Sequence, residues 1–434
     1  MEVTFPYGKD DVTLRVPDGT LVYESRFPQP AADAAETVLN ALREPIAAAP
    51  LREALVARRP GPVVVVVSDA TRPIPYARFL AELLAEIEAA GVARDEVTLL
   101  VATGMHRSST PAEREVMYGN AAQGFRVIDH DAADGAGLGE LPGRSWSGSR
   151  VRLNRLYVEA GFRLVTGLVE PHFMAGFSGG RKAVCPGLCS LETIRSFHGA
   201  GFLGNPLARN ASLSGNPCHE EALSIARMAA PDFSLNLVLN RRREVVRAFA
   251  GDLEKAHDAA CRFVRKCACP TVSAEADVVV TSSGGHPLDG TFYQCVKGLV
   301  SCLPAVRRGG AVISFGACDE GVGSSEYAAL MATYAGRWRD LLSDIRKPGA
   351  FTKDQWELQL QARALEKVGE DNLHFVSDGL PPEVLSRLSV HGHAVEAGAV
   401  GSKVQELLAR AAASGSKVAV IPEGPYCAPL APGT

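Results

Sequence analysis

The sequence predicts an α/β protein of two domains, each with a mostly parallel sheet. Runs of β-branched residues alternate with segments of helical periodicity, a pattern typical of βαβ units. The chain has 434 residues, more than one ordinary domain needs. The alternation stops at Pro270, after a helical segment, and then restarts. We therefore expect the domains to be residues 1–270 and 271–434.

The sheet of the first domain is expected to include residues 61–69, where five consecutive valines indicate a strand buried on both faces. A helix over Tyr76–Ala90 is expected to end at a glycine, and another is expected to begin at Pro111. The remaining elements follow the same patterns: strands Val97–Ala102, Arg126–Asp129 and Leu164–Val169, a hairpin of Phe233–Leu239 with Glu244–Ala250, and a helix over Leu253–Cys269.

The second domain repeats the alternation. We expect a turn at Gly309–Gly310, because two adjacent glycines separate a helical segment from an apolar one. The other expected elements are strands Asp277–Thr281, Ala311–Phe315, His374–Ser377 and Lys417–Ile421, and helices Phe292–Arg307, Gln355–Lys367 and Val404–Ala413.

The composition excludes several classes of protein. The net charge is only −4, and no basic stripe interleaved with aromatic residues is present, which weighs against a nucleic-acid partner. The strongest apolar run, Val63–Val67, is far shorter than the roughly 20 residues that span a bilayer. The amino-terminus lacks the pattern of a signal peptide. We therefore expect a cytoplasmic protein, without a membrane partner, whose ten cysteines are reduced and packed as small hydrophobic side chains.

Chemically reactive residues gather where predicted strands end, and ligands of parallel sheets bind at that edge. Asp69 and Arg72 follow the valine strand. Arg72 is suited to a two-point contact with a carboxylate or phosphate, although a solvated arginine in a turn is an equally good interpretation. His106 follows the next strand and is placed as a general base, while a purely structural histidine is the more common case.

Residues 170–182, EPHFMAGFSGGRK, form the most distinctive stretch. Its glycines predict a close approach of the backbone to a ligand, and Ser178, Arg181 and Lys182 could donate to a phosphate. It matches neither a Walker A loop nor the dinucleotide fingerprint. His198 lies beyond it in a helical segment, where a packed core residue is the usual interpretation. Without further information these signals predict a two-domain enzyme with an anionic ligand in the interdomain cleft.

A helix at the start of the second domain could present polar groups to that cleft. Tyr293 and Gln294 precede Lys297 by four and three residues, so the three side chains share one face of the helix. An exposed amphipathic face is an equally good interpretation of the same spacing.

Taken together, five segments resemble the nickel-dependent lactate racemases and related 2-hydroxy acid racemases and epimerases. The match spans about residues 60–300, with a further point at Lys353–Trp356. The segments occur in the family's order: SDATRP (68–73), TGMHR (103–107), EPHFMAGFSGGRK (170–182), SFH (196–198) and YQCVK (293–297).

The resemblance implies a nickel-pincer nucleotide, a pyridinium-3-thioamide-5-thiocarboxylate mononucleotide, attached covalently to Lys182 and loaded by cofactor-biosynthesis enzymes. It implies that His198 binds the nickel, a metal that imidazole suits. His106 and His172 would be the paired acid and base of a hydride-transfer reaction through a 2-keto acid. The remaining implied roles are substrate binding by Arg72, Gln294, Lys297 and Trp356, and cofactor contacts by Asp69, Arg72, Ser178, Gly179, Gly180 and Tyr293.

The substrate stays open among lactate, a dicarboxylate, a sugar acid and an aromatic hydroxy acid. Met174 and Cys295 are expected to line the pocket and to bear on this choice. Two other functions are also compatible with the pattern: a nicotinamide-dependent 2-hydroxy acid dehydrogenase, although the dinucleotide fingerprint is missing, and a ligand-binding homologue without turnover.

Overall fold

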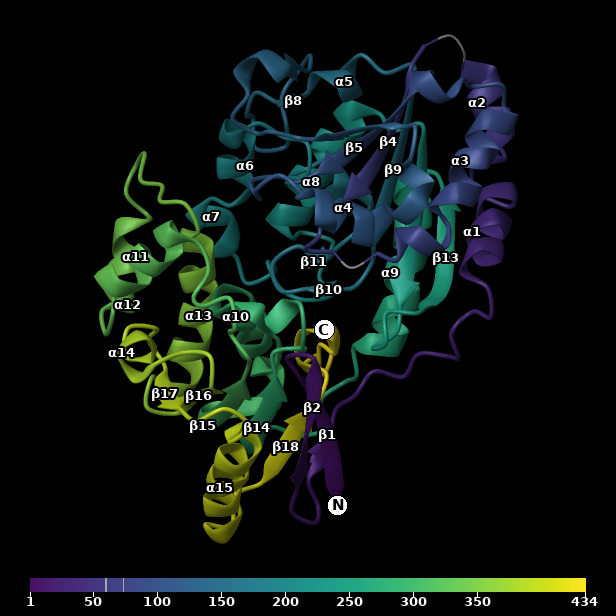
Figure 1. The fold of residues 1–434 in the computed structure, drawn as a ribbon. Helices are drawn as coiled ribbons and strands as arrows, with labels where there is room; N and C mark the ends of the chain where they lie inside the picture. The colour runs from purple at the N-terminus through teal and green to yellow at the C-terminus, as the bar shows by residue number, and fades with distance from the viewer. Residues whose placement is uncertain (59–60, 73) are drawn as a thin grey trace.

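The computed structural model describes residues 1–58, 61–72 and 74–434. Pro73, the last residue of the SDATRP segment, lies outside this range. Two six-stranded sheets, one above the other in Figure 1, form the two halves of the molecule. This confirms the predicted α/β class with mostly parallel sheets.

The first sheet is parallel except at one edge. Its order is β13 (Val245–Gly251), β12 (Phe233–Leu239), β9 (Phe162–Leu168), β4 (Val63–Ser68), β5 (Val97–Ala102) and β6 (Arg126–Asp129). The pairing of β12 with β13 is antiparallel, as the predicted hairpin requires.

The valines of β4 show why this strand lies at the centre. Val63, Val65 and Val67 pack into the cluster that holds helices α1 (Ala34–Arg43), α2 (Leu51–Arg58) and α3 (Leu80–Ala89). Val64 and Val66 point the other way, into the main core. Both faces of the strand are therefore covered, as a continuous β-branched run predicts.

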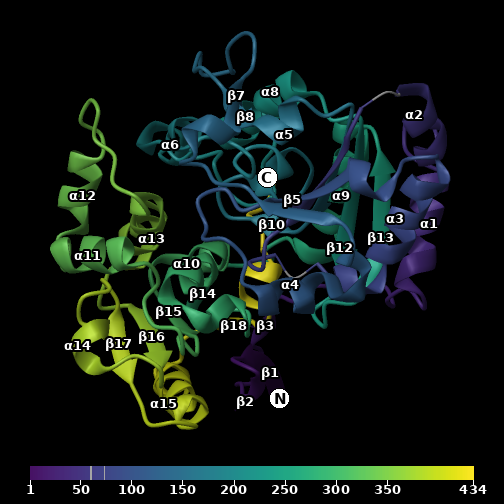
Figure 2. The same cartoon turned by 45° about the horizontal axis from the view of Figure 1, so that its top comes forward.

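The second sheet is parallel throughout, in the order β17 (His391–Ala394), β16 (Leu373–Ser377), β15 (Val306–Phe315), β14 (Ala276–Ser282), β18 (Val418–Ile421) and β3 (Leu21–Val22). Helix α15 (Val400–Ala413) and the hairpin of β1 (Glu2–Tyr7) with β2 (Asp10–Arg15) cover one face. Helices α10 (Phe292–Ser301) and α13 (Gln355–Val368) lie on the side that faces the first sheet (Figure 2).

The amino-terminal segment, which was predicted to belong to the first domain (residues 1–270), contributes a strand to the second sheet. β3 pairs with β18, so this segment belongs to the second sheet although it precedes the whole first domain. The division at Pro270 itself stays a prediction.

Two predictions in the second domain were wrong. The helix expected over residues 292–307 ends at Ser301, before Pro304, and β15 begins at Val306. The turn expected at Gly309–Gly310 lies inside β15, where the pairing with β14 shifts register between Ala276 and Val278. Gly309, with φ +70°, accommodates that irregularity instead of ending the strand.

Several elements were not predicted. They include the β1–β2 hairpin, α8 (Pro217–Ala229), α11 (Ser325–Thr333) and α12 (Trp338–Asp344). Of these, α8 has a clear start signal, because the Asn216 side chain accepts hydrogen bonds from two amides of its first turn and Pro217 follows.

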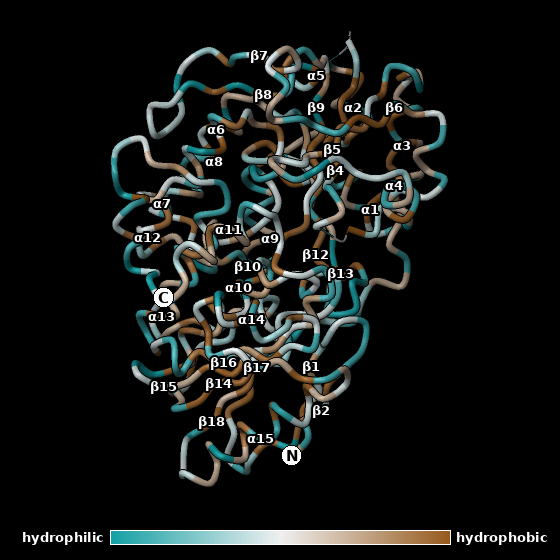
Figure 3. The backbone as a smooth tube through the Cα atoms, turned by 60° about the vertical axis from the view of Figure 1, so that its left-hand side comes forward, coloured by the Kyte–Doolittle hydropathy of each residue, from teal (hydrophilic) through white to brown (hydrophobic). Residues whose placement is uncertain are grey.

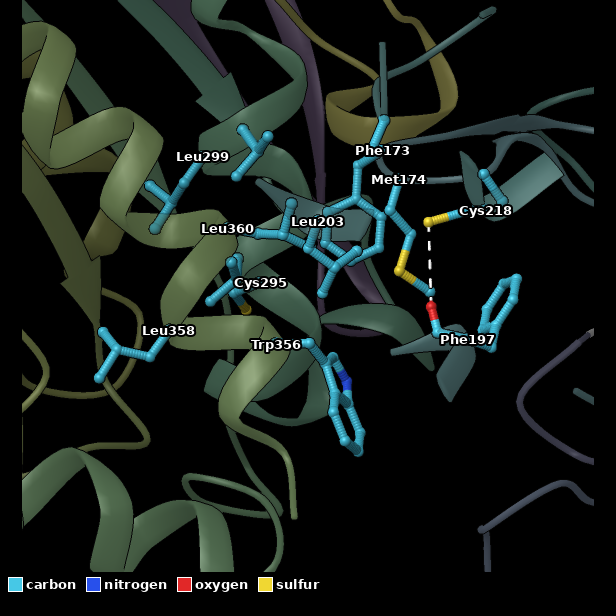
Figure 4. Packing of buried hydrophobic residues seen from close by; sticks show 14 of the residues in the cluster. Phe173, Met174, Phe197, Leu203, Cys218, Cys295, Leu299, Trp356, Leu358 and Leu360 are labelled. Carbon is cyan, nitrogen blue, oxygen red and sulfur yellow. Dashed lines mark hydrogen bonds between the residues drawn. The ribbon is translucent and has the colours of Figure 1, made fainter. Parts of the chain in front are cut away.

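One apolar cluster joins the two halves. Figure 4 shows Leu360 of α13 next to Phe173 of a loop from the first sheet, and Leu299 of α10 and Met174 belong to the same cluster. In Figure 3, which colours the backbone by hydropathy, the strands inside the molecule are mostly hydrophobic and the outer loops are mostly hydrophilic. The ten cysteines are all buried and free, which confirms the expectation of reduced, packed thiols. Within the described residues, no helix has both the length and the apolar character needed to cross a membrane.

Candidate active site

A cavity of about 690 Å³ lies where β4, β5 and β9 end, opposite the first turns of α10 and α13. This is the edge at which parallel sheets bind ligands. Twelve of the thirteen residues predicted from the sequence line it: Asp69, Arg72, His106, His172, Ser178, Gly179, Lys182, His198, Tyr293, Gln294, Lys297 and Trp356. The structure therefore brings together loops that are more than 280 residues apart.

His106 is oriented by a carboxylate. Its Nδ1 lies 2.5 Å from Oδ2 of Asp69, and the other carboxylate oxygen accepts bonds from the amide and hydroxyl of Thr71 at 3.2 and 2.7 Å. Burial opposes ionisation of Asp69, but the charge and hydrogen bond of His106, with the Thr71 hydrogen bond and Arg72, together lower the pKa of Asp69. The ionised carboxylate fixes one ring nitrogen and leaves Nε2 of His106 for proton exchange with a ligand.

His172 is held from both ring nitrogens. Its Nδ1 accepts from the amides of Met174 and Ala175 at 3.4 and 3.3 Å, and its Nε2 lies 2.9 Å from Nζ of Lys182. Since Nδ1 accepts, the proton of a neutral ring lies on Nε2 and points at the lysine nitrogen. That contact requires an uncharged amine on Lys182.

Electrostatics favour the same state. Burial first, and then the charges of Arg72 and Lys297, lower the pKa of Lys182 well below its usual value. Burial and the charges of Arg72 and Lys297 likewise lower the pKa of His172. An uncharged lysine amine is nucleophilic, so Lys182 is suited to forming a covalent bond with an acyl group.

His198 has the features of a metal ligand. It follows α6 (Leu191–Phe197), and its Nδ1 donates to the carbonyl of Ile194 at 3.1 Å, which leaves the lone pair on Nε2. Burial lowers the pKa of His198 to about 3, so the ring is neutral. The Trp356 ring lies against it, with centroids 4.4 Å apart.

The second domain contributes a buried acid and a cation. Burial raises the pKa of Glu357 to about 8, although Lys297 opposes the change. Burial and Arg72 lower the pKa of Lys297 to about 8. Near neutral pH the acid is therefore mostly protonated and the lysine mostly charged. Together with Arg72, this leaves a cavity with excess positive charge, suited to a carboxylate or phosphate.

The second domain also lines the cavity with Tyr293, Gln294 and Trp356. The indole Nε1 of Trp356 donates to the Tyr293 hydroxyl at 2.8 Å, which fixes both rings. The side-chain oxygen Oε1 of Gln294 is buried and has no hydrogen-bond partner among the described residues. Because an unpaired buried carbonyl is costly, a ligand that donates a hydrogen bond there would be favoured.

The glycines of the glycine-rich loop were expected to let the backbone approach a ligand, but two of them are instead crowded by protein atoms. A Cβ on Gly179 would lie 2.6 Å from Cγ2 of Val169, and one on Gly180 would lie 2.6 Å from the His257 ring. Both glycines therefore permit packing of the loop on the protein itself. Gly179 also lines the cavity, whereas Gly180 does not.

Arg181 and Cys295 were assigned wrongly. Arg181 is 1% exposed and donates to the carbonyls of Ala175 and Phe177 at 2.7 and 3.1 Å, so it braces the loop and is not available to a phosphate. Cys295 points away from the cavity, and its Sγ lies 3.8 Å from that of Cys318. Met174 does line the cavity, as expected.

Sequence reasoning missed two residues. Glu357 on α13 resembles a solvated helix glutamate in the sequence, and only its 2% exposure shows otherwise. His257 on α9 (Leu253–Ala268) is buried under the glycine loop, with Nε2 2.9 Å from the Ser178 carbonyl. Its signal was present in the strongly amphipathic pattern of that helix, which places His257 on the apolar side.

Comparisons with known proteins identify the family of the chain. Residues 7–211 match the lactate racemase N-terminal domain family, and residues 271–426 match the lactate racemase C-terminal domain family. A lactate racemase of Thermoanaerobacterium thermosaccharolyticum is 35% identical over 378 residues, or 84% of this chain and 85% of the relative. A lactate racemase of Lactiplantibacillus plantarum is 32% identical over 432 residues, or 97% of this chain and 98% of the relative.

Solved structures show the same fold. The lactate racemase apoprotein of T. thermosaccharolyticum superposes with a TM-score of 0.87 and 32% identity, over 99% of this chain and all of that one. A protein of Thermotoga maritima, 17% identical, has a TM-score of 0.65 over 88% of this chain and 97% of that one, which is a likeness of fold alone. With both domain families matched in order and the relatives aligned over most of their length, the chain belongs to the lactate racemase family of isomerases.

Proposed function

We propose that this chain inverts the C2 stereocentre of a 2-hydroxy acid, lactate or a close relative, with a nickel-pincer nucleotide attached to Lys182. One observation carries the proposal. Two histidines from different loops, His106 and His172, have their Nδ1 atoms fixed by the protein and line the same cavity as Arg72, Lys297 and Lys182.

The residues present fit the nucleotide. Lys182 supplies an uncharged amine for the tether, and His198 supplies a neutral imidazole with a free lone pair for nickel. The side-chain oxygen of Gln294 has no partner among the described residues and could accept a hydrogen bond from a ligand in the same cavity. When bound, the nucleotide would supply reversible hydride transfer at C2.

The protein would supply position and protons. The α-hydrogen of a 2-hydroxy carboxylate is a poor acid, so removing the hydroxyl proton while hydride departs avoids a carbanion beside the carboxylate. One histidine would take the hydroxyl proton of one enantiomer, and the other would serve the opposite enantiomer after the planar 2-keto acid has turned. Arg72 and Lys297 would retain the keto acid by its carboxylate between the two half-reactions.

Isotope exchange tests the reaction type. Inversion of an enantiopure 2-hydroxy acid in D₂O should leave the C2 hydrogen in place, because hydride moves between substrate and cofactor without exchanging with solvent. Full incorporation of deuterium at C2 during inversion would instead show direct proton abstraction and overturn the hydride proposal.

Mass spectrometry tests the cofactor. The chain co-expressed with pincer-nucleotide biosynthesis enzymes should gain a covalent mass increment and near-stoichiometric nickel, both absent from Lys182→Ala. A His198→Ala variant should keep the increment and lose nickel, which separates the tether from the metal ligand. A wild-type chain without increment or nickel, in a host that loads a known racemase, contradicts the assignment.

A further inference from the structure

Three of the ten histidines gather on the edge of the second sheet, away from the active site. His374 lies on β16, and His391 and His393 lie on the edge strand β17. His391 and His393 are two residues apart on a strand, so they share one face. His374 stands directly opposite His391 in the parallel register, which places the third side chain on that same face.

The spacing of the ring nitrogens suits a metal ion. One nitrogen from each of the three rings lies within 4.8 Å of the others, and Nδ1 of His374 lies 3.1 Å from Nε2 of His393. Imidazole nitrogens bound at about 2.1 Å to one tetrahedral ion lie roughly 3.4 Å apart. One pair is therefore already close enough, and small rotations of the side chains would bring in the third.

His391 is arranged as metal-binding histidines usually are. Its Nδ1 lies 3.2 Å from the carbonyl oxygen of Asp371 and donates to it, which fixes the tautomer and leaves a lone pair on Nε2. The rings of His391 and His393 stack with centroids 4.8 Å apart and planes 15° from parallel, so their nitrogens lie side by side. His391 is exposed, which gives an ion a path from solvent.

The surroundings permit a cation. Lys403 and Arg410 of the neighbouring α15 both form ion pairs with Glu406, so their charges are partly balanced.

We propose that His374, His391 and His393 form a second metal site, for one divalent ion of the zinc class, that fastens the edge strand β17 to β16. A donor set made only of imidazole favours zinc, nickel or copper over magnesium or calcium. None of the three side chains lines the cavity that holds His198. The site is thus independent of the proposed nickel-pincer nucleotide and of the reaction.

Zinc binding to the full-length, metal-free chain tests the proposal. Isothermal titration with Zn²⁺ should find one ion that His391→Ala and His393→Gln bind at least about a hundredfold more weakly, since loss of outer-shell partners alone costs up to that much. Two matched variants should keep this ion: His198→Ala, which removes an imidazole of the active site, and His286→Ala, which removes another exposed histidine.

Co²⁺ gives a second readout that does not depend on stability. Its visible absorption should show a site with nitrogen ligands in the wild type and in His198→Ala, and should be lost in His391→Ala. Zn²⁺ should also raise the melting temperature of the wild type but not of that variant. Equal zinc affinity in His391→Ala and the wild type, or a wild type whose bound zinc is lost only with His198→Ala, overturns the proposal.

Discussion

Replacing Lys297 by methionine should stabilise the chain at neutral pH while it removes substrate binding. Burial and Arg72 lower the pKa of Lys297 from 10.5 to about 8. As pH falls from 10.5 to 8, the unfolded lysine takes up a proton that the folded one does not, so stability is lost over this range and stays low below it. At about 1.4 kcal/mol for each pKa unit, the cost at pH 7 is on the order of 3 kcal/mol.

Methionine keeps the length of the side chain and its packing, and it carries no charge to desolvate. Urea unfolding at pH 7 should therefore show Lys297→Met more stable than the wild type by up to about 3 kcal/mol, with the difference vanishing near pH 10.5. In the loaded enzyme, loss of a charged hydrogen bond worth about 1.5–3 kcal/mol should raise KM for a 2-hydroxy acid by roughly 10- to 150-fold.

The matched control is Lys255→Met on α9, an exposed lysine whose replacement should change stability by less than about 0.5 kcal/mol. If Lys297→Met were no more stable than the wild type at pH 7, the charge of Lys297 would be fully compensated in the folded chain. The reasoning that the cavity carries uncompensated positive charge would then be refuted.

Two further variants test the loop and the buried acid. Gly176→Ala should lower the free energy of unfolding in urea by more than about 2 kcal/mol, because the new Cβ would lie 2.1 Å from the Ser212 carbonyl oxygen and the backbone has φ +80°. The control is Gly148→Ala, at φ +81° with open space around it, which should cost only the backbone strain. Equal losses in the two variants would contradict the steric clash. Burial raises the pKa of Glu357 from 4.5 to about 8, so the wild type should lose up to about 5 kcal/mol relative to Glu357→Gln as pH rises from 4.5 to 8. Parallel stability curves for the two chains over that range would count against the raised pKa.

The elements that sequence predicted well are those fixed by neighbours in the chain. β5 and β6 have the predicted bounds, because a short apolar segment between polar turns indicates a strand locally. β3 is different: its two residues, Leu21 and Val22, become a strand only by pairing with β18, almost 400 residues later. No local pattern carries that information.

The candidate site divides in the same way. His106 could be found because it follows a strand, and loops after parallel strands meet at one edge. Glu357 could not, since a glutamate in an amphipathic helix is normally solvated, and its burial depends on how α13 packs against α10 and the cavity. The glycine loop was located correctly, but its glycines proved to serve packing against Val169 and His257. Composition identifies such a loop without showing which side of it is crowded.

The two halves of the molecule divide the proposed roles in proton transfer and in substrate choice. The groups proposed to move protons, His106 and His172, are fixed by a carboxylate and by backbone amides within the loops of the first sheet. Those contacts do not depend on what occupies the cavity. The substrate would instead be held across the interface, by Lys297 from the second domain and beside Met174, a flexible side chain that tolerates ligands of different shape. Changes at the second wall can therefore alter which 2-hydroxy acid fits while the proton-transfer geometry stays in place.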